Sequence, residues 1–189
     1  MLRCKQTKNQ SVYLHGQSVA SYYKDLVQLI EEGHSHCEWR IPKWLKEYGK
    51  QLINDSHSKD LVNEYLIFHD CGKPFCHVVD EDGRSHFPDH ANVSKKTYLA
   101  ISDRCDKIKV ANLIGWDMLI HTASADEVGY YCENVWTKKD AFTLVLASIS
   151  ELHSNAIMFG GIESINFKSK WKKIDRRGKQ ICKHFLKEY

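Results

Sequence analysis

Apolar residues recur every three or four positions along most of this 189-residue chain, and only three prolines interrupt the pattern. This spacing puts apolar side chains on one face of an α-helix, whereas the two faces of a β-strand alternate at every residue. Helices are therefore expected over residues 11–33, 42–54, 61–70, 89–101, 107–121 and 138–159. The pattern predicts an all-α protein, a helical bundle in which some polar side chains occupy inward positions.

Two stretches lack helical periodicity. Residues 75–88 are expected to form a polar loop with a short hairpin around Asp82 and Gly83, and residues 122–137 are expected to be irregular. Gly160 and Gly161 end the most apolar helix and mark the only strong candidate boundary. We therefore expect a domain over residues 1–161 and a basic C-terminal helix or tail, residues 162–189, packed on the same domain.

Composition indicates a globular protein of ordinary size. Apolar residues at 42% and charged residues at 27% are typical of neither a disordered nor a membrane chain. No apolar run approaches the roughly 20 residues of a membrane helix, so no membrane partner is expected. The first ten residues lack the apolar core of a signal peptide, so we expect a cytoplasmic location. The seven cysteines include no CxxC pair and predict reduced thiols.

The segment Tyr65–Pro74, YLIFHDCGKP, ends an apolar helical run with a histidine and an aspartate. Gly72 follows as a typical helix-ending residue. His69 continues the apolar stripe of the helix, so its imidazole and the Asp70 carboxylate are expected side by side at the inner edge of a hydrophobic face. Two adjacent lone-pair donors suit a divalent cation. An ordinary helix end, with a histidine favoured by the helix dipole, is the alternative.

Glu151 lies in the most apolar helix, where desolvation of a carboxylate is costly unless an opposite charge compensates it. His15 lies in the first turn of the first helix, on or beside its buried stripe. With His69 and Asp70, these residues give two imidazoles and two carboxylates, a set that suits Mn, Ni, Co, Fe, Zn or Mg. Such an ion lowers the pKa of water and provides hydroxide for attack on phosphorus. For Glu151, an edge position or a pairing with lysine is the alternative.

His90, Asp117 and His121 form an outer set, because each faces the same way as the apolar stripe of its helix. We expect Asp117 as a further metal ligand, and His90 or His121 as the acid that protonates a leaving oxygen. Lys73 is expected to hold a phosphate oxygen as a point charge. A capping role for His90, a dipole interaction for His121 and an exposed lysine at 73 are the alternatives. Three further histidines are expected in loops or at the surface: His77, His86 and His153.

The eight residues Ile67–Pro74, aliphatic-x-His-Asp-x-Gly-Lys-Pro, resemble the signature of the HD superfamily of metal-dependent phosphohydrolases. Three later segments look like successive parts of the HD domain that follows the nucleotidyltransferase module in many bacterial CCA-adding enzymes: FPDH (87–90), WDMLIHT (116–122) and LVLASISE (144–151). The resemblance covers roughly residues 15–151. It implies metal ligands at His15, His69, Asp70 and Glu151.

The resemblance implies an HD-type phosphohydrolase standing alone, because the chain carries no nucleotidyltransferase module. The relatives are associated with phosphatase and 2′,3′-cyclic phosphodiesterase activities, so the favoured substrates are RNA ends or nucleotides with 2′,3′-cyclic phosphates. Two departures bear on the metal: Glu151 stands where the family normally has Asp, and Asp117 where relatives commonly have His. The alternatives are hydrolysis of free nucleotides, such as deoxynucleoside triphosphates, cyclic dinucleotides or alarmones, and a catalytically degenerate module that binds nucleotide or RNA.

The C-terminal segment is strongly basic. Between Lys168 and Lys187 there are nine basic residues and a single acid, Asp175. A basic helix interleaved with Phe167 and Trp171 could attract phosphate backbones, which makes contact between this tail and RNA one interpretation. A solvated face of a last helix is the commoner explanation of such a run of charges.

Overall fold

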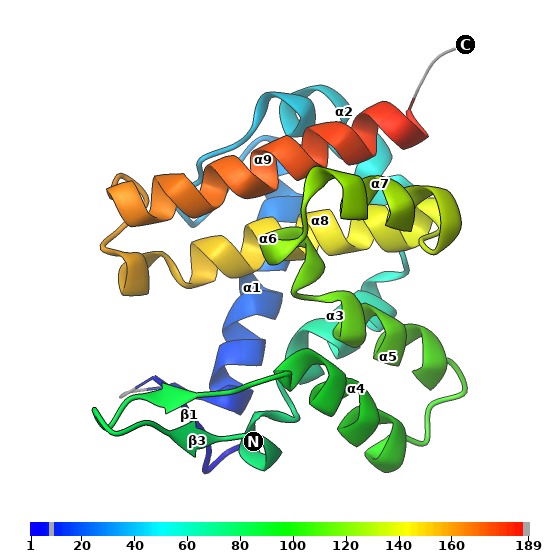
Figure 1. Cartoon of the computed structure of the whole chain (residues 1–189). Coiled ribbons are helices and arrows are strands. Elements are labelled where there is room, and N and C mark those ends of the chain that lie inside the picture. Colours follow the sequence, from blue (N-terminus) through cyan, green and yellow to red (C-terminus); the bar gives the residue numbers. More distant parts are fainter. Residues whose placement is uncertain (8–9, 187–189) are drawn as a thin grey trace. The chain divides into compact units, whose positions relative to one another are not determined.

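The structure is a computed structural model that describes residues 1–7 and 10–186. It is all-α, as expected, and within the described residues the strands are confined to two short antiparallel pairs (Figure 1). One pair joins β1 (Lys5–Thr7) to β2 (Gln10–Ser11), and the other joins β3 (Val78–Val79) to β4 (Ser85–His86). The second pair is the hairpin expected between residues 75 and 88. The first pair was not predicted.

Helices make up most of the described chain. The α-helices are α1 (Val12–Glu32), α2 (Lys43–Asn54), α3 (Lys59–Phe68), α4 (His90–Ile101), α5 (Lys107–Trp116), α6 (Leu119–Thr122), α7 (Ala125–Asn134), α8 (Lys138–Ser154) and α9 (Ile165–Phe185). Two short 3₁₀ helices are η1 (Lys73–Phe75) and η2 (Ala156–Phe159).

The chain divides into two compact units. Unit 1 comprises residues 1–20 and 59–117, and unit 2 comprises residues 21–58 and 118–189. The boundary expected after Gly161 falls inside unit 2, and the division into residues 1–161 and 162–189 stays a prediction. Lys187 of the expected basic tail, with the two residues after it, lies outside the described residues.

Unit 1 is built on α3, α4 and α5. Helix α5 packs against both α4 and α3, and the apolar stripe of α3 is buried, including Val62 and Tyr65. The turn after α3 is tied to α4, because the backbone N–H of Gly72 donates to the Ser94 hydroxyl at 2.9 Å. These contacts fix the position of the residues that follow α3.

Unit 2 is built around α8. Every side chain from Ala141 to Ser150 is buried, as expected of a helix that is packed on all sides. Helices α2, α6 and α9 contact α8, and α7 packs on α9 (Figure 1). Helix α9 buries Phe167, Ile174 and Ile181 completely or nearly so, so the basic segment belongs to the core of this unit as well as to its surface.

Three expectations about helices are wrong. Residues 122–137 are not irregular, because they contain α7, whose start is a capping box: the Ser124 hydroxyl accepts the Glu127 N–H, and the Glu127 carboxylate accepts the Ser124 N–H. The helix expected over residues 107–121 divides into α5 and α6 at Asp117 and Met118. The helix expected to continue to Phe159 ends at Ser154 and is followed by η2.

The seven cysteines are all free thiols in the structure. None of the helices in the described part of the chain combines the length and the apolar character that a bilayer span requires.

Candidate metal centre

The turn after α3 carries the His69–Asp70 pair into a buried position. Helix α3 ends at Phe68, two residues before the expected end of this helix, so His69 and Asp70 follow its last turn. The side chains of His69 and Asp70 are each only 2% exposed. The Nε2 atom of His69 lies 3.3 Å from Oδ2 of Asp70, so the two donors face a common point.

His15, from the first turn of α1, completes a cluster with this pair. Its side chain is 1% exposed, and its Nε2 atom lies 3.7 Å from Oδ2 of Asp70. The rings of His15 and His69 have centroids 5.2 Å apart and are inclined at 62°. One ligand atom from each of the three residues lies within 4.8 Å of the others. The structure thus brings together two segments more than fifty residues apart in the chain.

Backbone carbonyl groups set the orientation of two histidine rings. Nδ1 of His69 lies 2.7 Å from the carbonyl oxygen of Leu66, and Nδ1 of His90 lies 3.0 Å from that of Phe87. A carbonyl oxygen only accepts, so in each ring Nδ1 carries the proton. In the neutral form, Nε2 then has the lone pair. Metal-binding histidines commonly donate a hydrogen bond in this way from the ring nitrogen that does not bind the metal.

Asp70 is surrounded by groups that carry or can carry positive charge. The Lys73 ammonium donates to its Oδ2 at 2.6 Å and also to Gln6 at 2.8 Å, and Nε2 of His90 lies 3.7 Å from its Oδ1. Burial, the largest single influence, raises the pKa of Asp70, but the charges on His69 and Lys73 outweigh it and hold the pKa well below its usual range. Lys73 is itself buried, which excludes the exposed lysine considered for this position.

Asp117 joins the same part of unit 1. It follows the last residue of α5 and is 6% exposed, and one of its oxygens lies within 4.8 Å of a ring nitrogen of His69. The Tyr65 hydroxyl donates a hydrogen bond to its Oδ1. Sequence reasoning missed this role of Tyr65, although Tyr65 precedes His69 by four residues on the same helical stripe.

His121 and Glu151 belong to unit 2 and lie next to each other there. Nε2 of His121, in α6, is 3.0 Å from Oε2 of Glu151, in α8. The two side chains are 20% and 17% exposed, respectively. The expected roles of Glu151 as a metal ligand and of His121 as a general acid stay predictions.

Arg177 supports the short helix that carries His121. Its Nη1 donates to the carbonyl oxygen of Ile120 and its Nε to that of Ala123, both at 2.8 Å. These carbonyl groups flank His121 near the C-terminal end of α6, where helix carbonyl groups lack partners within the helix. Sequence reasoning counted Arg177 only as one charge of the basic tail.

His153 is not the loop or surface histidine that the sequence predicted. It is 1% exposed, and its Nε2 accepts the backbone N–H of Arg40 at 3.0 Å. Its Nδ1 lies 2.8 Å from the carbonyl oxygen of Ile149. His77 and His86 are exposed in the hairpin region, as predicted.

The donor set in unit 1 fits a divalent cation. Two imidazole nitrogens and a carboxylate oxygen from His15, His69 and Asp70 suit a borderline or hard ion, and Asp117 offers a further oxygen nearby. Comparisons with models of known families, with curated proteins and with solved structures find no match to this chain. Membership of the HD superfamily therefore stays a prediction from the motifs.

Proposed function

We propose that this protein is a metal-dependent phosphohydrolase whose metal ligands include His15, His69 and Asp70. The observation that carries the proposal is the convergence of these three side chains, with their ligand atoms within 4.8 Å of one another. Each side chain is at most 2% exposed. Burial of several ionisable groups in one place is costly unless they bind a common partner, and a cation meets this requirement.

The same three residues would hold the ion, and Asp117 would add an oxygen ligand. A divalent ion in such a site makes water nucleophilic at neutral pH and neutralises charge on phosphate oxygens. Asp70 is suited to this role because its low pKa keeps it ionised over the whole physiological range. The carbonyl groups that bind Nδ1 of His69 and His90 keep both rings aimed at Asp70.

Two other side chains act on the substrate in this proposal. Lys73 holds a non-bridging phosphate oxygen with the ammonium group that lies 2.6 Å from Asp70. His90 is 20% exposed, more than the other groups around Asp70, so it is the group that a substrate reaches first. It protonates the leaving oxygen. The favoured substrates are 2′,3′-cyclic phosphates on RNA ends or nucleotides, as the resemblance to HD domains implies.

The test compares Asp70→Ala with Asp103→Ala, a matched loss of an exposed aspartate in the same unit. Each protein is loaded with Mn²⁺ and assayed with a chromogenic phosphodiester and with an oligonucleotide ending in a 2′,3′-cyclic phosphate. We expect Asp70→Ala to lower kcat/KM by about 100-fold or more and Asp103→Ala to leave it unchanged. Equal turnover by wild type and Asp70→Ala would refute the proposal.

A second candidate function is binding of a phosphorylated nucleotide without hydrolysis. The observation that favours it is the Lys73 ammonium at Oδ2 of Asp70. With the imidazoles of His15, His69 and His90 nearby, the site offers several groups that can donate hydrogen bonds to phosphate without any metal. Such a site attracts phosphate directly.

Calorimetric titration with AMP, in the presence of Mn²⁺ or of EDTA, separates the two functions. Affinity that EDTA leaves unchanged, together with no turnover over a panel of metals, favours the binding module. Turnover that is lost with EDTA and restored by Mn²⁺ favours the hydrolase.

A further inference from the structure

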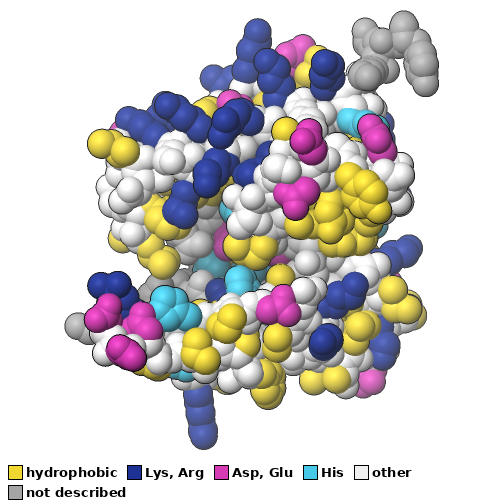
Figure 2. Space-filling view, in the orientation of Figure 1, with side chains coloured by type: hydrophobic (Ala, Val, Ile, Leu, Met, Phe, Trp, Pro, Cys, Tyr) yellow, Lys and Arg dark blue, Asp and Glu magenta, His cyan; other side chains and the backbone are white. Residues whose placement is uncertain are grey.

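Five cationic side chains form one row along α9. Counted at 100° per residue, they fall within a sector of about 80° on the helix, and they are Lys168, Lys172, Arg176, Lys179 and Lys183. The row is about 22 Å long at 1.5 Å per residue. The buried face of α9, with Ile174 and Ile181, points elsewhere. Figure 2 shows lysine and arginine side chains gathered along this helix.

Most of this row is free of compensating charge. Lys168 pairs with Glu163 at 2.6 Å, but among the residues that the structure describes, the other four members of the row make no ion pair. The single acid of α9, Asp175, accepts the indole N–H of Trp44 at 3.1 Å and is half-buried. Asp175, although it lies among the basic residues in the sequence, therefore bonds to Trp44 and not to a lysine of the row.

A row of like charges at this spacing is unfavourable. Cations three or four residues apart on a helix destabilise it, by amounts comparable to those by which opposite charges stabilise it. A helix face that served only solubility would mix acids with its lysines, as surface helices generally do. The arrangement on α9 instead favours a polyanion that follows the helix and neutralises the row.

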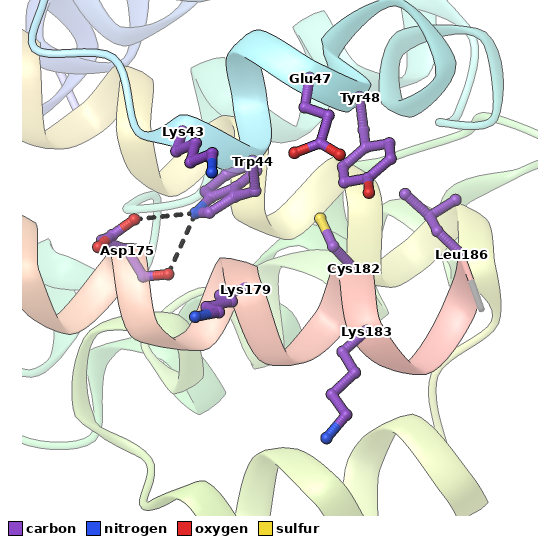
Figure 3. A pocket seen from close by; sticks show the side chains of 9 residues that line it. All are labelled: Lys43, Trp44, Glu47, Tyr48, Asp175, Lys179, Cys182, Lys183 and Leu186. Carbon is purple, nitrogen blue, oxygen red and sulfur yellow. Dashed lines mark hydrogen bonds between the residues drawn. The ribbon is translucent and has the colours of Figure 1, made fainter. Parts of the chain in front are cut away.

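A cavity between α9 and α2 adjoins the row. Its volume is about 490 Å³, within the range of ligand pockets. Three lysines, Lys43, Lys179 and Lys183, outnumber the two acids that line it, Glu47 and Asp175, and Tyr48 and the apolar Leu186 complete this part of the wall (Figure 3). Lysines beside an aromatic ring are the combination with which proteins hold the phosphates and the base of an unpaired nucleotide.

We infer that unit 2 binds single-stranded RNA along α9, with phosphates on the row from Lys168 to Lys183 and one base in the cavity beside Tyr48. A duplex has no unstacked base for this cavity. A membrane surface is a poorer partner, because the apolar face of α9 is buried in the unit and is not free to enter lipid. The inference takes the nature of the polyanion from the proposed function, but its evidence is the charge and shape of unit 2 alone.

Fluorescence anisotropy with a labelled 12-nucleotide single-stranded RNA tests the inference on the full chain. The triple variant Lys172→Gln, Lys179→Gln, Lys183→Gln should bind about 100-fold more weakly at 100 mM salt, and the slope of log affinity against log salt should fall by about 2. The matched control removes three exposed lysines outside the row, with the same change in net charge: Lys96→Gln, Lys109→Gln, Lys139→Gln. It should retain most of the wild-type affinity.

Tyr48→Leu tests the cavity. It should weaken single-stranded RNA by about 10-fold and leave weak binding to duplex RNA unchanged. Equal losses in the triple variant and its control, tighter binding to duplex than to single strands, or binding to phosphatidylserine vesicles without binding to RNA would each overturn the inference.

The experiment separates this inference from the proposed function. Asp70→Ala should lower hydrolysis by about 100-fold or more and retain most of the affinity for a single-stranded RNA without a 2′,3′-cyclic phosphate. The triple variant should retain hydrolysis of the small chromogenic phosphodiester. RNA binding without any turnover would refute the hydrolase and leave the RNA surface standing, whereas turnover without RNA binding would do the reverse.

Discussion

Gly16 permits the close contact that places His15 beside His69. A Cβ atom built on Gly16 would lie 2.3 Å from the backbone oxygen of Ile67 and 2.9 Å from its carbonyl carbon. Both neighbours are backbone atoms, so neither can rotate away. We therefore predict that Gly16→Ala displaces the start of α1 from the turn that carries His69 and Asp70.

The geometry sets the magnitude of this effect. The oxygen contact is about 1 Å shorter than ordinary van der Waals contact, so α1 must move by a comparable distance. Overpacking of this kind costs about 1–3 kcal/mol, and the better helix propensity of Ala returns up to about 1 kcal/mol. The net loss of unfolding free energy should be about 1–2 kcal/mol. If His15 is a metal ligand, as proposed, its displacement should weaken Mn²⁺ binding by about 10- to 100-fold.

Urea unfolding and calorimetric titration with Mn²⁺ measure the two effects separately. The matched control is Gly129→Ala in α7, where the new Cβ would meet only a side-chain atom of Gln180 at 3.5 Å. That variant should gain up to about 1 kcal/mol in stability and keep its Mn²⁺ affinity. A folded Gly16→Ala protein with wild-type Mn²⁺ affinity would refute the idea that this contact positions His15.

Two predictions concern unit 2. Burial lowers the pKa of His153 from 6.5 to about 4, so the folded state favours the neutral ring. The neutral ring of His153 therefore contributes fully to the unfolding free energy above pH 6.5. This contribution, about 3 kcal/mol in all, is lost as the pH falls toward 4. His153→Leu should therefore flatten urea-derived stability between pH 7 and 5, and His34→Leu, at an exposed site, should not. Arg177→Met should lower the unfolding free energy by about 2–3 kcal/mol, because the hydrogen bonds of Arg177 to the carbonyl groups of α6 and Ala123 are lost. The control Arg176→Met removes an exposed neighbouring charge and should change the unfolding free energy by less than about 0.5 kcal/mol. Equal effects of the two variants would contradict the role of Arg177 in supporting α6.

The helices that could be predicted are those whose signals are local. The stripe of α3 and the glycine after α1 each lie within a few residues of the structure they specify. Helix α7 also had a local signal, the capping box Ser124-x-x-Glu127, although the segment lacks a clear helical periodicity and was expected to be irregular. The pairing of β1 with β2 involves strands of two or three residues, too short for an alternation to be visible.

In the candidate metal centre too, features specified by neighbouring residues could be predicted, and contacts between distant residues could not. The turn with His69 and Asp70 could be predicted because its signals lie in ten consecutive residues. The contact between Lys73 and Gln6 could not be predicted, because the two residues are sixty-seven positions apart and nothing in the sequence pairs them. His153 was misjudged because α8 is buried on every side, so even its polar positions face the interior.

The basic segment shows why a count of charges does not define an interaction surface. Arg177 and Lys179 are equal in such a count, yet Arg177 binds backbone carbonyl groups and Lys179 lies beside the cavity. Deletion of the segment would also remove Phe167 and Ile181, which are fully buried in unit 2. Loss of RNA binding after deletion would therefore report unfolding as readily as lost contacts. Neutralising lysines of the exposed row, with Arg177 retained, removes the charge and keeps the fold.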